Sequence, residues 1–187
     1  MCYTIDMKNF EVLYDVAEGN FGLISFAQAK TLGISIRELD RWVKCGRLER
    51  SSRGLYRISR FSVSEYDPYA IAVESVGRDA YLHGESVLAL LRLVPTNPTW
   101  IYVASPRRVR RKVGEGILVV QGTPGYEFTN YNGIRSQHLG DAILACGATV
   151  CEDRRVRAVD EGYRRGYLRK DERSAIKREV RRESASA

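Results

Sequence analysis

Three basic residues recur at a spacing that could serve nucleic-acid chemistry. Arg37, Arg41 and Lys44 follow the spacing i, i+4, i+7, which places three cations on one face of a helix. Guanidinium and ammonium groups bind phosphates, and the planar arginine fork also fits the edge of guanine in the major groove. This face is therefore a candidate for binding nucleic acid.

A basic hairpin is predicted directly after this helix. Residues 48–50 and 55–58 have the composition of short strands, and the four residues between them, ending in Gly54, form a turn. A hairpin beside a helix in the major groove would lie along the phosphate backbone. Further DNA contacts are therefore predicted for its arginines, which are Arg47, Arg50, Arg53 and Arg57.

The elements before the hairpin predict a helix-turn-helix. Apolar spacing indicates a first helix over residues 9–18. Ser25 with Gln28, and Ser35 with Glu38, each have the spacing of a capping box, so short helices should begin at residues 26 and 36. Two capped helices joined by a glycine turn are typical of a helix-turn-helix, and the basic hairpin after them makes it a winged one.

The apolar residues of the third helix indicate which side is buried. Ile36, Leu39 and Val43 fall on one face, with Trp42 at its border. An apolar face must be covered by other parts of the protein, so the opposite basic face should be displayed. The same charges could also form an ordinary solvated face or a protein-binding surface. The order of capping boxes, glycine turn and basic hairpin favours DNA.

This part of the chain resembles a known family. FGLISFAQA at residues 21–29, GIS at 33–35, LDRWVKCGRLER at 39–50 and RGLYRI at 53–58 occur in the order seen in the N-terminal domain of AbiEi-type antitoxins. The resemblance covers residues 9–60. It implies a transcriptional autorepressor that binds double-stranded promoter DNA at an inverted repeat, as a dimer or as cooperative monomers.

The resemblance also implies a functional partner, a cognate nucleotidyltransferase-like toxin of a type IV (AbiE-like) toxin–antitoxin system. Antitoxins of this type act without forming a stable complex, so direct contact with the toxin stays open. The residues around His83 and around Asp141 resemble the middle domain that follows the winged helix in AbiEi-like proteins.

The remaining residues predict an α+β fold class for the whole chain. We expect helices over residues 68–76, 84–94 and 137–146, with strands at 99–104, 117–120, 126–128 and around 134. After residue 150 the sequence is dense in both charges and predicts helices over 152–165 and 171–182. The predicted domains are a winged helix-turn-helix over 1–62, a smaller mixed α/β antitoxin-like domain over 63–150, and charged C-terminal helices with a tail over 151–187.

A second basic surface is predicted between two of the strands, at a loop or hairpin tip. It could be a solubilising turn, or it could contact the DNA backbone or the toxin. Its residues are Arg107, Arg108, Arg110, Arg111 and Lys112. Two further functions stay open for the whole chain. One is a nucleic-acid-binding protein of low specificity that uses the basic C-terminal helices, and the other is a protein–protein adaptor.

Composition and missing motifs exclude several other classes. The chain has 187 residues, 44% of them hydrophobic, and a formal net charge of +7 that comes mostly from arginine. The four cysteines lack zinc spacing, so we expect reduced thiols that pack as small residues, and no metal. No signal peptide or membrane span is present, which indicates a cytoplasmic protein.

The sequence also lacks the motifs of an enzyme. His83-Gly84-Glu85 imitates part of a zinc deaminase motif, but the P-C-x-x-C that would complete the metal site is missing. There is no phosphate-binding loop and no nucleophile elbow. We therefore predict no catalytic residues, no cofactor and no enzymatic activity, and we expect His83 to pack at the start of the helix that follows it.

Overall fold

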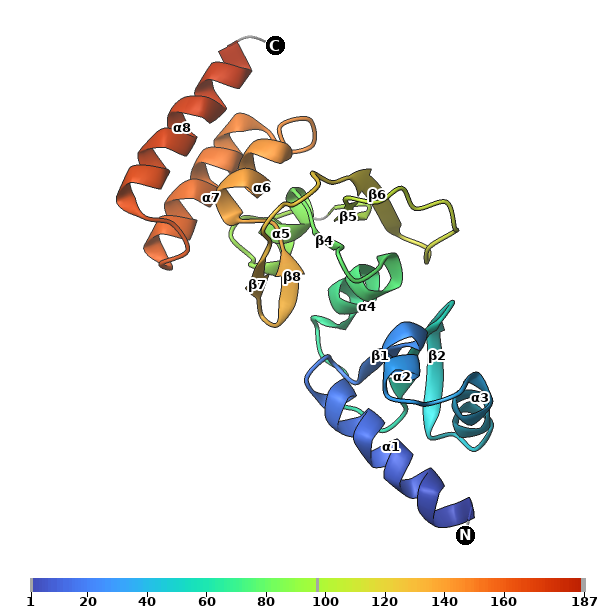
Figure 1. The fold of residues 1–187 in the computed structure, drawn as a ribbon. Coiled ribbons are helices and arrows are strands. Elements are labelled where there is room, and N and C mark those ends of the chain that lie inside the picture. The colour runs from blue at the N-terminus through green and yellow to red at the C-terminus, as the bar shows by residue number, and fades with distance from the viewer. Residues whose placement is uncertain (1, 97, 186–187) are drawn as a thin grey trace. The chain divides into compact units, whose positions relative to one another are not determined.

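The computed structural model describes residues 2–96 and 98–185, and these form two compact units (Figure 1). The N-terminal unit contains the described residues up to Arg78 together with Arg111–Gly114. The C-terminal unit contains Asp79–Arg110 and the described residues from Glu115 onward. Both units combine helices with sheet, so the predicted α+β class is confirmed.

The N-terminal unit packs helices on a small antiparallel sheet with strand order β1-β3-β2. Its elements are α1 (Cys2–Glu18), β1 (Leu23–Ser25), α2 (Phe26–Thr31), α3 (Ile36–Lys44), β2 (Leu48–Ser52), β3 (Leu55–Ile58) and α4 (Asp67–Val76). The core draws on every helix from α1 to α3 and on all three strands. Its fully buried side chains include Leu13, Ile24, Leu39 and Trp42.

Helix α4 packs on the sheet of the N-terminal unit, although it lies beyond the domain boundary predicted at residue 62. The Ser52 and Ser75 hydroxyls, from β2 and α4, lie 2.8 Å apart and share a hydrogen bond. Helix α4 begins at Asp67, one residue before the predicted range 68–76. Pro68 lies in its first turn, where the missing N–H of proline costs nothing because an N–H there would be unpaired anyway. The predicted three-part division at residues 62 and 150 stays a prediction.

The C-terminal unit contains a mixed sheet with strand order β6-β5-β4-β8-β7. Its elements are β4 (Tyr81–Leu82), α5 (Glu85–Leu90), β5 (Ile101–Ser105), β6 (Ile117–Gln121), β7 (Thr129–Tyr131), β8 (Ile134–Ser136), α6 (Leu139–Ala145), α7 (Glu152–Arg164) and α8 (Lys170–Ala185). The sheet packs on a core that includes Leu82, Leu88, Val103 and Ile143, all fully buried. Helix α5 is shorter than the predicted 84–94, and the strand predicted at 126–128 lies at β7 instead.

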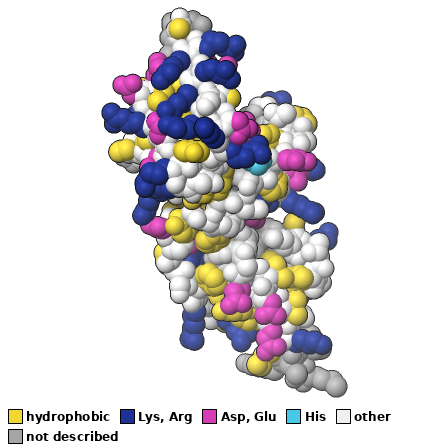
Figure 2. All heavy atoms as spheres, turned by 90° about the vertical axis from the view of Figure 1, so that its left-hand side faces the viewer, with side chains coloured by type: hydrophobic (Ala, Val, Ile, Leu, Met, Phe, Trp, Pro, Cys, Tyr) yellow, Lys and Arg dark blue, Asp and Glu magenta, His cyan; other side chains and the backbone are white. Residues whose placement is uncertain are grey.

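Helices α7 and α8 are joined by ion pairs between the two helices as well as within each one. Asp160 of α7 lies 2.6 Å from both Arg173 and Lys177 of α8, and these two cations lower the pKa of its carboxyl group. Arg155, almost fully buried, pairs with Glu183 at 2.6 Å. Figure 2 shows basic and acidic side chains interspersed over these helices. Many of the charged side chains of α7 and α8 are therefore paired with one another.

Candidate nucleic-acid interface

Two reciprocal capping boxes fix where α2 and α3 begin. The Ser25 and Ser35 hydroxyls accept the backbone N–H groups of Gln28 and Glu38 at 3.2 and 3.3 Å. In return, the Gln28 and Glu38 side chains accept the backbone N–H groups of Ser25 and Ser35, each at 2.9 Å. Each box satisfies two donors that the first turn of a helix would leave unpaired. Both predicted helix starts are confirmed.

The turn between these helices depends on Gly33, whose φ is +77°. This left-handed conformation is costly for other residues. It allows the N–H of Ile34 to donate to the carbonyl oxygen of Ala29 at 2.9 Å, and it leaves the Ile34 side chain buried in the core. The turn therefore sets the direction in which α3 leaves α2.

The buried side of α3 differs from the prediction. Leu39 and Trp42 are fully buried, and the Trp42 ring packs edge-on against Phe10 of α1 with 5.2 Å between ring centroids. Val43 is half-buried, but Ile36 is 44% exposed. The expectation that Ile36 lies in the core is therefore wrong. Helix α1 contacts α3 at Glu38 and Trp42, and this contact leaves Ile36 uncovered on the first turn.

Helix α1 also holds α3 through a polar contact. The Asn9 side-chain amide donates to Glu38 Oε1 at 2.8 Å, while the other carboxylate oxygen accepts the Ser35 N–H. The pKa of Glu38 lies below its usual value because the Ser35 N–H and then the Asn9 amide stabilise the charged form. The ionised carboxylate therefore fixes α3 against α1.

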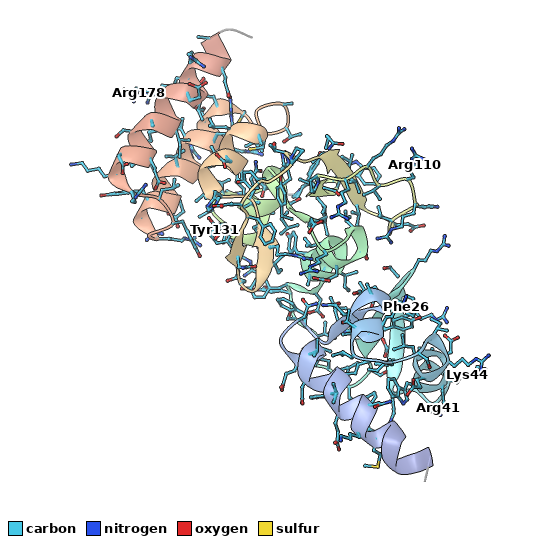
Figure 3. All side chains as sticks on the ribbon, viewed as in Figure 1. Phe26, Arg41, Lys44, Arg110, Tyr131 and Arg178 are labelled. Carbon is cyan, nitrogen blue, oxygen red and sulfur yellow. The ribbon has the colours of Figure 1, made fainter. Side chains whose placement is uncertain are left out.

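The opposite side of α3 carries the predicted basic residues. Arg37, Arg41 and Lys44 are all exposed. Figure 3 shows the Lys44 side chain extending from α3 away from the core. Within the part of the chain that the structure describes, Arg37 and Lys44 have no ion-pair or hydrogen-bond partner. These two cations are available to a ligand.

An ion pair that was not predicted from the sequence joins the hairpin to α3. Arg50 of β2 forms an ion pair with Asp40 of α3, and its guanidinium lies 5.8 Å from the centroid of the Tyr56 ring. Asp40 was not among the predicted site residues. Its partner is ten residues away, across a turn, and no helical periodicity signals such a pair. This exposed contact joins the hairpin to α3 on the side of its basic face.

The other hairpin arginines occupy different environments. Arg47 is exposed and lies over the Phe10 ring at 4.6 Å, a cation–π contact with α1. Arg53 is exposed at the turn beside Gly54, whose φ is +76°. Among the described residues Arg53 has no side-chain partner. The Arg53 guanidinium at the tip of the hairpin is therefore available to a ligand.

Arg57 has a role different from the one predicted. Its guanidinium lies 2.6 Å from Asp67 Oδ2 and donates to the carbonyl oxygen of Ser62 at 3.2 Å. Only 13% of its side chain and 7% of the Asp67 side chain are exposed. A cation this enclosed has little access to a phosphate. We therefore correct the assignment of Arg57 from DNA contact to a link between β3 and α4.

The predicted second basic surface is divided between the two compact units. Arg107 pairs with Asp79 at 3.1 Å in the C-terminal unit. Arg111 belongs to the N-terminal unit, where it donates to the carbonyl oxygens of Ser75 and Val76 at the end of α4. Arg108, Arg110 and Lys112 are exposed and have no partner among the described residues. Two of the five predicted residues thus stabilise the fold.

The cysteines do not all pack as predicted. Cys146 is buried, and loss of solvent raises the pKa of its thiol to about 12, but Cys45 and Cys151 are exposed.

No group of three or more His, Cys, Asp or Glu side chains in the described part of the chain could hold a metal ion. Burial lowers the pKa of His83, whose backbone N–H donates to the carbonyl oxygen of Tyr102.

No helix in the described ranges, 2–96 and 98–185, is long and apolar enough to span a bilayer.

Comparison with known families supports the resemblance seen in the sequence. Residues 11–59 match a family described as "Transcriptional regulator, AbiEi antitoxin". The matched segment runs from α1 to the end of the basic hairpin and includes every residue of the candidate interface on α3. No curated protein matches the chain.

Proposed function

We propose that the N-terminal region is a winged helix-turn-helix that binds promoter DNA. This proposal is supported by the match of the region to the AbiEi antitoxin family of transcriptional regulators. Helix α3 would lie in the major groove and the β2–β3 hairpin would serve as the wing. The observation that carries the proposal is the basic face of α3. Arg37, Arg41 and Lys44 are exposed on one side, while Leu39 and Trp42 hold the other side in the core.

The environments of these residues suggest different roles on DNA. Arg37 and Arg41 lie on the first two turns of α3, the part of a recognition helix that reaches base edges, and their planar forks suit guanine. Lys44 on the last turn and Arg53 at the hairpin tip suit the phosphates on either side of the groove. Arg47 and Arg50, which already contact Phe10 and Asp40, would contribute less.

The biological role follows from the family. We propose an antitoxin that represses its own operon at an inverted repeat and counteracts a nucleotidyltransferase-like toxin in the cytoplasm. This role needs double-stranded DNA as a ligand and neither a cofactor nor catalytic residues, so we propose a regulator without enzymatic activity. A gene for such a toxin beside this one would support the role, and its effect on growth with and without this protein would test it.

A mobility-shift experiment on the DNA immediately upstream of the gene tests DNA binding. The double variant Arg37→Ala/Arg41→Ala should lose at least tenfold in affinity, because each arginine lost from a base edge or phosphate costs about 1–3 kcal/mol. The matched control is Arg154→Ala/Arg157→Ala, which removes two exposed arginines from α7. Binding that scrambled DNA competes away equally, or that the α3 variant retains, would contradict the proposal.

The second candidate is binding of low specificity by the C-terminal helices. Several exposed cations there have no partner among the described residues: Arg154, Arg157, Lys170, Arg178 and Arg181. Other cations of these helices are held in ion pairs, as Arg173 and Lys177 are by Asp160, which leaves less charge for a ligand. In the mobility-shift experiment, this candidate predicts that Arg154→Ala/Arg157→Ala loses DNA binding and that Arg37→Ala/Arg41→Ala retains it.

A further inference from the structure

Strand β6 forms one edge of the sheet in the C-terminal unit, and its outer side is unpaired within the described residues. It runs parallel to β5 with Ile101 opposite Ile117 and Ser105 opposite Gln121. Beyond the two ends of the strand, Ile101 N–H donates to the carbonyl oxygen of Gly116, and Gly122 N–H donates to that of Ser105. Since backbone groups alternate in direction along a strand, the even-numbered residues of β6 bond to β5. The N–H and C=O groups of Ile117, Val119 and Gln121 therefore point outward.

Strand β6 lacks the features that usually prevent an edge strand from pairing with another chain. Proteins usually protect an edge with a charged residue, a proline, a bulge or a very short strand. The sequence of β6 is Ile-Leu-Val-Val-Gln, with no charge and no proline, and its register with β5 is continuous. Its four apolar residues are all half-exposed. The opposite edge, β7, has only the three residues Thr129–Tyr131. Strand β6 thus has the properties of a strand that pairs with another chain.

The sequence of β6 is suited to pairing with itself. In an antiparallel pair with a two-fold axis at Val119, Val119 lies opposite its own copy and Ile117 lies opposite Gln121 of the second chain. These are the residues whose backbone groups point outward, so every outward N–H and C=O finds a partner in this one register. Leu118 then lies opposite Val120, which places apolar side chains together on the same face.

Charges at the ends of the strand favour the same arrangement. Glu115 is exposed just before β6 begins. At the other end, the Gln121 side chain donates to the carbonyl oxygen of Pro106, so the strand ends beside the loop that carries Arg108 and Arg110. An antiparallel pair brings the start of one β6 to the end of the other. Each Glu115 would therefore lie near Pro106, where the basic loop of the second copy begins, and β6 itself contributes no charge to the interface.

We infer that β6 is the edge through which two copies of this chain associate, forming one continuous sheet across the dimer. The inference adds to the proposed function the surface by which two copies would meet before occupying an inverted repeat. It depends on the geometry of β6 and not on the basic face of α3. Association measured without DNA therefore separates its failure from a failure of DNA binding.

The experiment is sedimentation of the full chain over a wide range of concentrations, without DNA. The wild type should form dimers, and Val119→Pro should weaken association at least tenfold. Proline at this position removes an outward N–H while leaving the bonds to β5 intact, which an edge strand tolerates. The control Val119→Thr keeps both the N–H and the shape, so it should dimerise like the wild type. Val119→Lys, which also keeps the N–H, should weaken association by placing charge at the two-fold axis.

Hydrogen exchange gives a second readout on the unmodified protein. The amides of Ile117, Val119 and Gln121 should exchange more slowly as the protein concentration rises, while the amide of Asn130 in β7 should not change. A wild type that stays monomeric would overturn the inference and leave the edge to a different protein. A dimer that both Val119→Pro and Val119→Lys leave intact would overturn it as well.

Discussion

Arg57 and Asp67 form a nearly buried ion pair that ties the basic hairpin to the helix after it. Arg57 Nη2 lies 2.6 Å from Asp67 Oδ2. The Ser64 hydroxyl donates to the other oxygen of the same carboxylate at 2.8 Å. Removing either side chain would leave the other charge buried without a partner, because the remaining group is not fully hydrated in this environment. The pair makes α4 part of the structural support for the hairpin.

Replacing Arg57 should therefore affect folding more than DNA binding. We expect Arg57→Ala to lower the free energy of unfolding by about 3 kcal/mol, since it leaves the Asp67 carboxylate buried without its partner. Arg53→Ala is the matched control at an exposed arginine of the same hairpin, and it should change stability by about 0.5 kcal/mol or less. Urea unfolding followed by circular dichroism measures both. Equal stability of Arg57→Ala and the wild type would mean that the ion pair with Asp67 does not stabilise the fold.

The part of the candidate site that was predictable is the part built from local contacts. Both capping boxes join residues three apart, so the sequence alone contains the whole interaction. The basic face of α3 likewise follows from helical spacing. Tertiary packing decides the rest. Periodicity placed Ile36 in the core and Trp42 at the border, but Phe10 of α1 covers Trp42 and leaves Ile36 exposed.

Non-local pairing explains the other differences. Strands β1 and β4 were not predicted, because they contain only three and two residues and form through partners far along the chain. The arginine pattern gave Arg53 and Arg57 the same role. Only the position of Asp67, ten residues beyond Arg57, separates them. Chemical type along a sequence thus identifies which residues could bind phosphate, and the fold decides which of them are free to do so.

The capping box of α3 should make stability depend on pH. The folded protein lowers the pKa of Glu38 because the Ser35 N–H and the Asn9 amide donate to its charged carboxylate. A lowered pKa contributes stability above the unfolded value near 4.5, and this contribution is lost as pH falls through the folded value. Glu38→Gln keeps the acceptor oxygen but not the charge, so it should cost about 0.3–1 kcal/mol at neutral pH, the contribution of a negative charge near a helix N-terminus.

Chemical denaturation of both proteins along a pH series measures this difference. The stability curves of the wild type and Glu38→Gln should converge as the solution becomes more acidic than the folded pKa. Glu11→Gln, on an exposed position of α1, is the control and should follow the wild type at every pH. Curves of wild type and Glu38→Gln that stay parallel would show that the Glu38 charge contributes nothing to the hold of α1 on α3.

The thiols should differ sharply in reactivity. Cys146 is 3% exposed, and burial raises the pKa of its thiol to about 12, so very little thiolate forms near neutral pH. Cys45 and Cys151 are exposed. Iodoacetamide treatment of the native protein, followed by mass spectrometry, should modify Cys45 and Cys151 and spare Cys146 until denaturant is added. Modification of Cys146 at the rate of the other two would mean that α6 opens in solution.

The salt dependence of DNA binding should separate phosphate contacts from structural arginines. Each cation that neutralises a phosphate releases counterions, so its removal lowers the slope of log affinity against log salt by about 1. We expect this change for Lys44→Ala and for Arg53→Ala, whose side chains are exposed and unpaired among the described residues. Arg57→Ala should leave the slope unchanged under conditions where the variant is folded, because the Arg57 charge already faces Asp67. A loss of slope in Arg57→Ala equal to that in Arg53→Ala would mean that DNA draws Arg57 away from Asp67 on binding.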